Sequence, residues 1–483
     1  MTPLLGAFCI LRAKEDVPNA DNIKSAAVWS ALSALMLTTS LLVFSYNSAN
    51  PGQDYGHRYL HLHLEVGRFS AYFMEVTAFL TLLATLLAKS EINCQIKKFA
   101  IMTLLLEALS MILFSAETVF IFSIAFLGIV FVLYCLLGTF ATTTTASSTD
   151  HGFFSLFLGA VLMLCSCIYI TASTGISEIR ILAEHPISPL MAHAFFAMFF
   201  IGMCSMLGLF PLHSWIFDAY AIAPRSIALL LNGVSSLAGG YGISYVLLPI
   251  TKSICGHNYD YAIYFLLISM SYSSLSAVIQ QDLRSILPRV AACYAAFSVI
   301  GILSGDTNGF AGGVYNILAS GVIIALPLGV LCAARKTAAK SKDNTTNEAE
   351  VVCNIRYLPT VAMASLLMLV ATPPSPLFNG GFFIAIGLLR NHLLLCVWLC
   401  SLMIGGSFFI IRRFWKIFSN GNGGGHKKKE MTIAIGELTY LLPAMLFVLL
   451  VGIFPQIIMN PMHCFGLPSQ FLDKRFATGG LWE

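Results

Sequence analysis

Long apolar runs alternate with short polar connections along almost the whole chain. Each run contains few charged residues, and most approach or exceed the roughly 20 residues that a helix needs to cross the hydrocarbon core of a bilayer. Helices are expected because a spanning segment has to satisfy its backbone hydrogen bonds internally. The pattern predicts an all-α polytopic membrane protein with about 13–15 transmembrane helices, some discontinuous. The predicted spans lie near residues 26–46, 69–88, 99–116, 118–137, 153–172, 190–210, 226–250, 259–280, 286–304, 311–334, 357–372, 380–413 and 435–458.

Composition agrees with a membrane domain. Hydrophobic residues make up 57% of the 483 positions and charged residues 10%, whereas soluble domains carry roughly 25% charged residues. We expect a transmembrane helical domain at 69–460, preceded by N-terminal helices and a loop (1–68) and followed by a tail (461–483). The run 2–11 is short for a span, which leaves a truncated first helix or an upstream start codon as interpretations.

Basic residues are concentrated in a few connections, which predicts the orientation of the chain. If the stretch 380–413, interrupted near Arg390 and His392, is one span, even numbers of predicted spans separate these connections. They then share one face, which the positive-inside rule makes cytoplasmic. The basic connections are 12–24, 89–98, 284–289, 335–342 and 412–429.

Cysteine spacing indicates neither a disulfide framework nor a metal site. The 13 cysteines are scattered, mostly inside apolar runs, without a CxxC pair or a Cys/His quartet of zinc spacing. Cys396 and Cys400 share a helix face, where small packing residues are the simpler explanation. We expect no metal and no cofactor. No basic stripe with interleaved aromatic residues indicates nucleic-acid binding.

Ionisable side chains inside spans are costly, so those present are candidates for function. Glu75 and Glu107 lie well inside apolar runs, and His193 lies near the start of another. They are candidates for a proton or ion path. The alternative is structural, namely an interhelical hydrogen bond or pairing with a lysine near a helix end.

The segment 209–225 (LFPLHSWIFDAYAIAPR) places prolines and polar side chains between two strongly apolar runs. Prolines break helices, and a break at membrane depth is tolerated where the freed backbone faces protein or water. Such a break beside His213 and Asp218 is typical of an ion or proton path. The alternative is a loop at the membrane surface with an interfacial tryptophan, Trp215.

This segment resembles the broken-helix signature of the antiporter-like membrane subunits of respiratory complex I (NADH:quinone oxidoreductase) and of Mrp-type cation/proton antiporters. The family pattern is loosely Pro-Leu-His-x-Trp-x-x-Asp-Ala-x-x-x-Ala-Pro. The matching residues here are Pro211, Leu212, His213, Trp215, Asp218, Ala219, Ala223 and Pro224. Similar but weaker matches occur at 280–287 (QQDLRSIL), at 373–387 and at 437–456, and the resemblance covers roughly residues 60–460.

The resemblance implies buried charges on the fifth, seventh, eighth, eleventh and twelfth helices, and this chain departs from that pattern. The fifth-helix glutamate falls near Phe126 or Leu127, and the two central lysines fall on Met206 and Leu237. The eleventh-helix histidine falls on Ser320, and the twelfth-helix charge on about Gly381. No lysine lies between Lys98 and Lys252, so the loss of both lysines holds under local changes of register.

Three functions remain open at this point. The first is an antiporter-like subunit of a complex I-type assembly (chain M or N type) with degenerate proton transport. The others are an Mrp-type monovalent cation/proton antiporter subunit and a membrane scaffold that transports nothing. As an enzyme it would be at most a non-redox subunit of a translocase, meeting quinone and NADH only through partner subunits. We expect the bacterial cell membrane or the mitochondrial inner membrane.

Overall fold

The computed structural model describes residues 2–12, 20–47, 64–92, 94–140, 146–251, 257–280, 282–341, 358–389, 393–420 and 441–465. These residues are almost entirely helical, and outside the helices they form only two isolated β-bridges, Leu64–Ala116 and Thr118–Glu178. The expected all-α fold is confirmed. The helices are α1 (Thr2–Arg12), α2 (Ala20–Asn47), α3 (Arg68–Glu91), α4 (Ile96–Ser115), α5 (Val119–Phe140), α6 (Ala146–Thr174), α7 (Ile179–Glu184), α8 (Pro189–Met206), α9 (Ser214–Ile222), α10 (Arg225–Tyr241), the π-helix η2 (Gly242–Leu247), α11 (Leu248–Ile250), α12 (His257–Ile279), α13 (Leu283–Leu303), α14 (Thr307–Ile323), α15 (Ala325–Ser341), α17 (Leu358–Leu369), α18 (Pro376–Leu389), α19 (Leu393–Asn420), α21 (Leu441–Ile453) and α22 (Gln456–Phe465).

Within the described residues, ten helical segments are long and apolar enough to cross a membrane, or eleven if the bent pair α21–α22 is one span. This is fewer than the 13–15 expected. The difference lies in shorter apolar helices, among them α1, α17 and α18, which the apolar runs alone cannot distinguish from full spans. The chain is an integral, multi-pass membrane protein.

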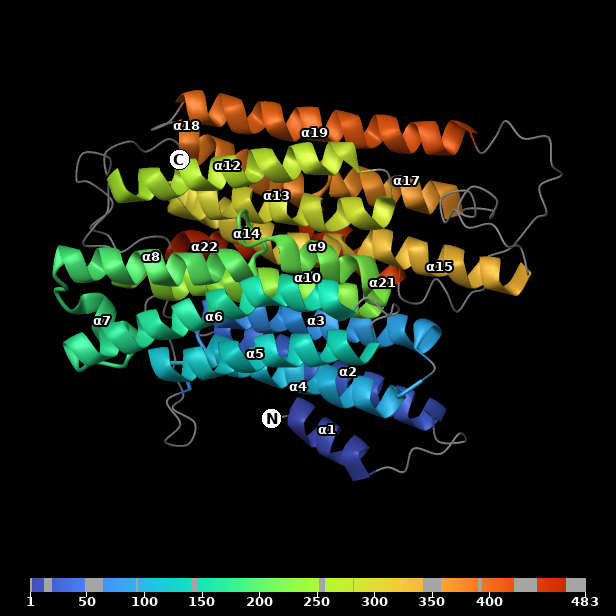
Figure 1. Ribbon diagram of the computed structural model, residues 1–483, viewed down its shortest axis with the longest axis horizontal. Helices are drawn as coiled ribbons and strands as arrows, with labels where there is room; N and C mark the ends of the chain where they lie inside the picture. The colour runs from blue at the N-terminus through green and yellow to red at the C-terminus, as the bar shows by residue number, and fades with distance from the viewer. Residues whose placement is uncertain are drawn as a thin grey trace.

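The long helices run side by side in one bundle, with α1 and α2 at one edge and α19 at the other (Figure 1). The centre is formed by α3, α10 and α14. The most apolar 18-residue stretches within 225–250 and 307–333 are completely buried, whereas only 22% of the corresponding stretch in α2 is buried. A bundle helix that is apolar on all sides belongs either in the centre or against lipid.

Small residues let the central helices approach closely. A Cβ atom added to Gly233 of α10 would lie 2.6 Å from Cδ1 of Leu80 on α3. One added to Gly321 of α14 would lie 3.4 Å from both Leu80 Cδ1 and the Cα of Gly233. Glycine at such contacts allows backbones to pack at distances that side chains would prevent. The centre of the bundle is therefore tightly closed.

Side-chain contacts bring three of the basic connections together. The Lys24 ammonium donates to the carbonyl of Lys89 at 3.3 Å. Glu91 contacts Arg225. Arg284 donates to the carbonyl of Ala223, which lies two residues before Arg225. The connections 12–24, 89–98 and 284–289 therefore meet at one end of the bundle, which we call the basic face. Arg335, Lys336 and Lys340 are on the part of α15 whose side chains are not described, and Lys342 lies outside the described residues.

The stretch 380–413 forms two helices rather than one. α18 ends at Leu389 and α19 begins at Leu393, while Arg390 and His392 lie outside the described residues. α18 is instead the second half of a broken unit with α17, from which residues 370–375 separate it.

Candidate functional site

The helix break predicted at 209–225 is present. α8 ends at Met206 and α9 begins at Ser214, with Gly208 between them at a φ of +65° and a cis peptide bond at Phe210–Pro211. The freed backbone is held by neighbouring helices, since the Phe210 amide donates to Ser269 Oγ at 2.9 Å. The Trp215 indole donates to the carbonyl of Ser205 at 2.7 Å and has no exposed surface. The interpretation of Trp215 as an interfacial residue is therefore wrong.

Two of the candidate residues, His213 and Asp218, lie on this break and belong to one polar cluster. His213 Nε2 lies 3.0 Å from the Tyr272 hydroxyl of α12 and its ring packs edge-on against Phe217. The guanidinium of Arg289 lies 4.6 Å from the centre of the Phe217 ring and interacts electrostatically with Asp218. Asp218 is exposed, whereas His213 is half-buried. The cluster thus reaches the lateral surface of the isolated chain.

Glu107 lies deeper than any other candidate. It has no exposed surface, and neither carboxyl oxygen has a hydrogen-bond partner among the described residues. Thr81 of α3 faces it, and the hydroxyl of Thr103, one turn earlier on α4, is also buried without a partner. An uncompensated polar group in such a place costs free energy. Among the described residues no lysine pairs with Glu107, and the polar group that faces it from another helix is the Thr81 hydroxyl.

Glu75 and His193 are separate from both of these groups. Glu75 is half-buried and faces Thr38 of α2, on the side of α3 away from α10. His193 is exposed in the first turn of α8, where its Nδ1 contacts the carbonyl of Pro189. The candidates therefore do not form a single line of ionisable groups through the bundle.

The positions where the resemblance implies charge are apolar or small and mostly buried. Met206 and Leu237 have no exposed surface, and Ser320 is 4% exposed and donates back to the carbonyl of Ile317 at 3.0 Å. Leu127 on α5 is half-buried. A Cβ atom at Gly381 would meet the ring of Phe297 at 3.3 Å. At these five positions, apolar or small residues that pack in the bundle stand where the family has charged side chains.

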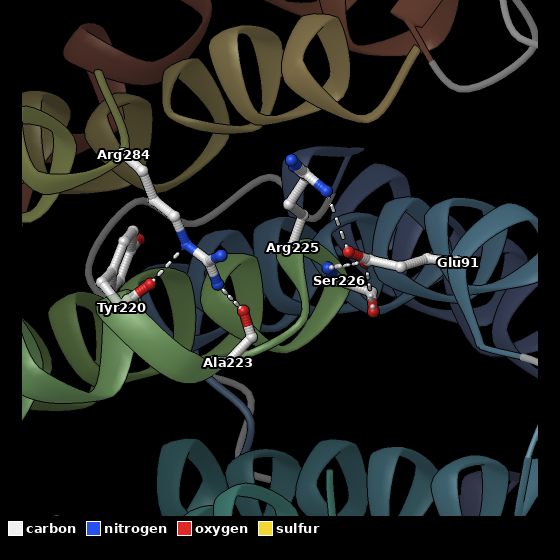
Figure 2. Close-up of polar contacts among 6 residues, drawn as sticks. All are labelled: Glu91, Tyr220, Ala223, Arg225, Ser226 and Arg284. Carbon is white, nitrogen blue, oxygen red and sulfur yellow. Dashed lines mark hydrogen bonds and ion pairs between the residues drawn. The ribbon is translucent and has the colours of Figure 1, made fainter. Parts of the chain in front are cut away.

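A polar network at the basic face was not anticipated (Figure 2). Glu91, at the end of α3, lies 3.4 Å from Arg225 and accepts from the Ser226 amide at 3.1 Å. Arg284 of α13 donates to the Tyr220 carbonyl at 2.6 Å and also to that of Ala223. The network neutralises the N-terminus of α10 and the C-terminus of α9. Arg225 lies in the segment 209–225 and Arg284 in the segment 280–287, both of which carry the family resemblance. The sequence did not indicate which residues these two arginines contact.

A second unanticipated group lies in the other half of the bundle. The Asn316 amide of α14 donates to Ser298 Oγ at 2.9 Å, and its Oδ1 is buried without a partner among the described residues. Asn316 lies one turn before Ser320 and beside Gly380, because a Cβ atom at Gly380 would be 3.0 Å from the Asn316 Cβ. A neutral amide therefore occupies the space next to two of the positions that lack charge.

Comparison with known proteins agrees with the motif. The chain is 24% identical to "NADH-quinone oxidoreductase subunit M" of Rickettsia felis over 472 residues, covering 95% of each chain. A subunit of respiratory complex I from Thermus thermophilus shares the fold, with a TM-score of 0.80 at 20% identity over 96% of both chains. A chain of the archaeal membrane-bound sulfane sulfur reductase superposes with a TM-score of 0.82 at 18% identity, covering 96% of this chain and 95% of that one.

The family model described as "NADH:quinone oxidoreductase/Mrp antiporter, TM" matches residues 116–410, which is more than half of the 483 residues. The match contains the helix break, the Arg284 turn and the central helices α10 and α14. The chain therefore belongs to the NADH:quinone oxidoreductase/Mrp antiporter family of membrane subunits.

Proposed function

We propose that the chain is an antiporter-like membrane subunit of a complex I-type assembly, of the chain M type, in which the lysine-based proton axis has been lost. Similarity to a subunit M over 95% of both chains supports membership in such an assembly. NADH and quinone are handled by partner subunits, and this chain contributes no redox chemistry. The subunit M relatives from Rickettsia felis and Rickettsia typhi support the bacterial cell membrane over the mitochondrial inner membrane.

The observation that supports the loss is the burial of apolar side chains where the charges are expected. Met206 and Leu237 have no contact with solvent. The described parts of α5, α8, α10, α14 and α18 carry no charged side chain except Arg225 at the basic face. Moving a proton through hydrocarbon requires groups that can hold it or water that can solvate it. Leucine and methionine provide neither.

Any remaining path has to use other groups. Glu107 is the best placed of these, because it is buried in the bundle and bound to no partner among the described residues. His213 and Asp218 are next, since they lie at the helix break. Glu75 faces the peripheral helix α2, and His193 is exposed on α8. We therefore rank Glu75 and His193 behind the other three.

The same observations also allow two alternative functions, an Mrp-type antiporter subunit and a scaffold that transports nothing. An Mrp-type subunit shares the family, but its partners would be other antiporter subunits rather than redox subunits. A scaffold that transports nothing is favoured by the packed centre at Gly233 and Gly321. Both alternatives also predict a larger complex, so the identity of the partners and the proton flux separate the three.

The test is affinity purification of the tagged full-length chain in mild detergent. We expect it to co-purify with the membrane and redox subunits of a quinone oxidoreductase. Recovery of Mrp subunits alone, or of the lone chain, would contradict the proposal. Reconstitution of the same assembly with Glu107→Gln then separates a rerouted path, in which flux falls, from a scaffold, in which flux does not change. Asp21→Asn, a change at an exposed carboxylate of α2, is the control.

A further inference from the structure

Glu75 on α3 has an incomplete set of hydrogen-bond partners. Its Oε2 is buried without a partner among the described residues, and Thr38 of α2 is the polar side chain that faces it. The Thr38 hydroxyl has a single hydrogen, which it donates to the carbonyl of Leu35 at 2.9 Å, so it presents its oxygen to Glu75. An ionised Glu75 therefore receives neither a cation nor a full set of donors from the described part of this chain.

Glu75 lies between helices from the two ends of the chain. Residues three and four apart are neighbours on a helix surface, so Glu75 shares a face of α3 with Tyr72 and Phe79. Tyr72 donates to the carbonyl of Ile457 on α22 at 2.9 Å, and the Phe79 ring stacks on Phe447 of α21 at 4.8 Å between centroids. α2 packs along the other side of α3. We call the strip of α3 between α2 and α21–α22, with Tyr72, Glu75 and Phe79, the Glu75 seam.

The rims of the Glu75 seam are apolar and exposed. Leu37 and Leu41 form the rim on α2, and Leu446 and Leu450 form the rim on α21. Glu75 between them is half-buried. In a membrane, lipid or another protein covers such a surface. A carboxyl group within it is costly unless the covering molecule pairs with it.

The depth of Glu75 favours a protein partner over a lipid headgroup. α3 ends in the basic network at Glu91, so its first residue, Arg68, lies at the opposite face. The 24 residues of α3 correspond to about 36 Å of helix, against a hydrocarbon core of about 30 Å. With α3 centred, Glu75, seven residues after Arg68, lies roughly 7 Å inside the hydrocarbon. Acyl chains carry no hydrogen-bond donor, so a donor at this depth has to come from protein.

A transmembrane helix with a basic side chain satisfies all of these conditions. Its apolar surface covers the leucines of the rims, and its backbone hydrogen bonds are internal, as hydrocarbon requires. A lysine or arginine supplies both the charge and the donors that Glu75 lacks, and ionisable residues inside membranes commonly pair with one another. A hydroxyl or an amide would supply a donor but would leave the charge of the carboxylate uncompensated.

We propose that the Glu75 seam is the docking site of a transmembrane helix of a partner subunit, which places a lysine or arginine against Glu75. The inference rests on the proposed function, because a partner helix is present only in an assembly. It goes beyond that function by assigning Glu75 to subunit contact rather than to a proton path. This role accounts for the position of Glu75, which lies apart from Glu107 and from His213.

The test is photo-cross-linking of the full-length chain in its native membranes, with the cross-linked peptide identified by mass spectrometry. p-Benzoylphenylalanine introduced at Leu41 or at Leu450, one on each rim, should capture the same apolar peptide, with a lysine or arginine within about two turns of the cross-link. The same probe at Tyr261 is the control. Tyr261 is 73% exposed on α12, which packs on α13 and α19, and it should not capture that peptide.

The charge is tested with substitutions at Glu75. Glu75→Gln keeps the shape and should lower the cross-linking yield per recovered chain on the order of tenfold, whereas Glu75→Asp keeps the charge and should retain most of the yield. Asp21→Asn, at an exposed carboxylate of α2, is the matched control and should leave the yield unchanged. Glu75→Lys should abolish the cross-link, and changing the identified basic residue of the partner to glutamate should restore it.

Several outcomes would overturn the docking site: no cross-linked peptide, a peptide without a basic residue, cross-links to lipid alone, or a yield that Glu75→Gln does not change. The identity of the partner tests the assembly separately. A basic helix that is lost with Glu75→Gln but belongs to no quinone oxidoreductase would support the docking site and contradict the proposed function.

Discussion

Leu237 lies near the middle of the span formed by α10, η2 and α11 (225–250), and therefore near the centre of the bilayer. In a helix the Cα–Cβ bond is tilted toward the N-terminus. A longer side chain at 237 would therefore extend toward Gly233, where α3, α10 and α14 are in close contact. The position offers neither a counter-ion nor a route to water.

We expect Leu237→Lys to destabilise the assembly strongly, by several kcal/mol, because it buries an unpaired ammonium. The measurement is the thermal denaturation midpoint of the purified assembly in detergent. Leu237→Met conserves the volume and should cost less than about 1.5 kcal/mol. A stable Leu237→Lys assembly would mean that water already reaches this position, which contradicts the loss of the axis.

At the residue scale, some of the candidate site followed from the sequence. The break at Pro211 and the burial of Glu107 were both predictable, because proline chemistry and the cost of a carboxylate in hydrocarbon are local properties. The contact between Glu91 and Arg225 was not, because the two residues are 134 positions apart. Nor was the environment of Glu107, which depends on side chains of other helices such as Thr81 of α3.

Among the helices, the two broken units α8–α9 and α17–α18 are stabilised differently. The first is held by side chains, Ser269 and Trp215. The second is held by the backbone of α21, since the Asn379 amide donates to the Gly452 carbonyl at 2.6 Å. A Cβ atom at Gly452 would collide with the carbonyl oxygen of Pro374. Gly452 is therefore required for α21 to dock on the second break.

We expect Gly452→Ala to destabilise the assembly by about 1–3 kcal/mol, the usual cost of overpacking. Protease resistance of the region around α17 and α21 should fall together with the denaturation midpoint. Gly405→Ala on α19 is the matched control, because a Cβ atom there has nothing within 4 Å. It should be neutral or stabilise by up to about 1 kcal/mol. Similar effects of the two substitutions would exclude a docking role for Gly452.

Continuous apolar runs located several helices closely. The runs 99–116 and 118–137 correspond to α4 (Ile96–Ser115) and α5 (Val119–Phe140). Two features escaped prediction. The run 311–334 divides at Ile324 into α14 and α15, and the run 226–250 contains the π-helix η2. Hydropathy does not change at either point. Each feature instead lies just before a proline, Pro327 or Pro249, which has no N–H to bond the carbonyl four residues earlier.

For the whole molecule, the basic face gives an orientation that can be measured without substitution. Cys94 is exposed in the connection between α3 and α4 on that face. We expect a membrane-impermeant thiol reagent to modify Cys94 from the cytoplasmic side only. Cys165, exposed on α6 but within a span, should stay unmodified because lipid surrounds it. Modification of Cys94 from the opposite side would reverse the predicted orientation.

The close contact of Leu80, Gly233 and Gly321 also limits how this chain can change over generations. Regaining a central lysine would require a charged side chain at 237 and, at the same time, smaller neighbours to admit water around it. Either change alone is unfavourable: the lysine would be buried without a partner, and a smaller residue at Leu80 would leave a void. Single mutations therefore do not restore the central lysine. We expect proteins that descend from this chain to keep the closely packed centre.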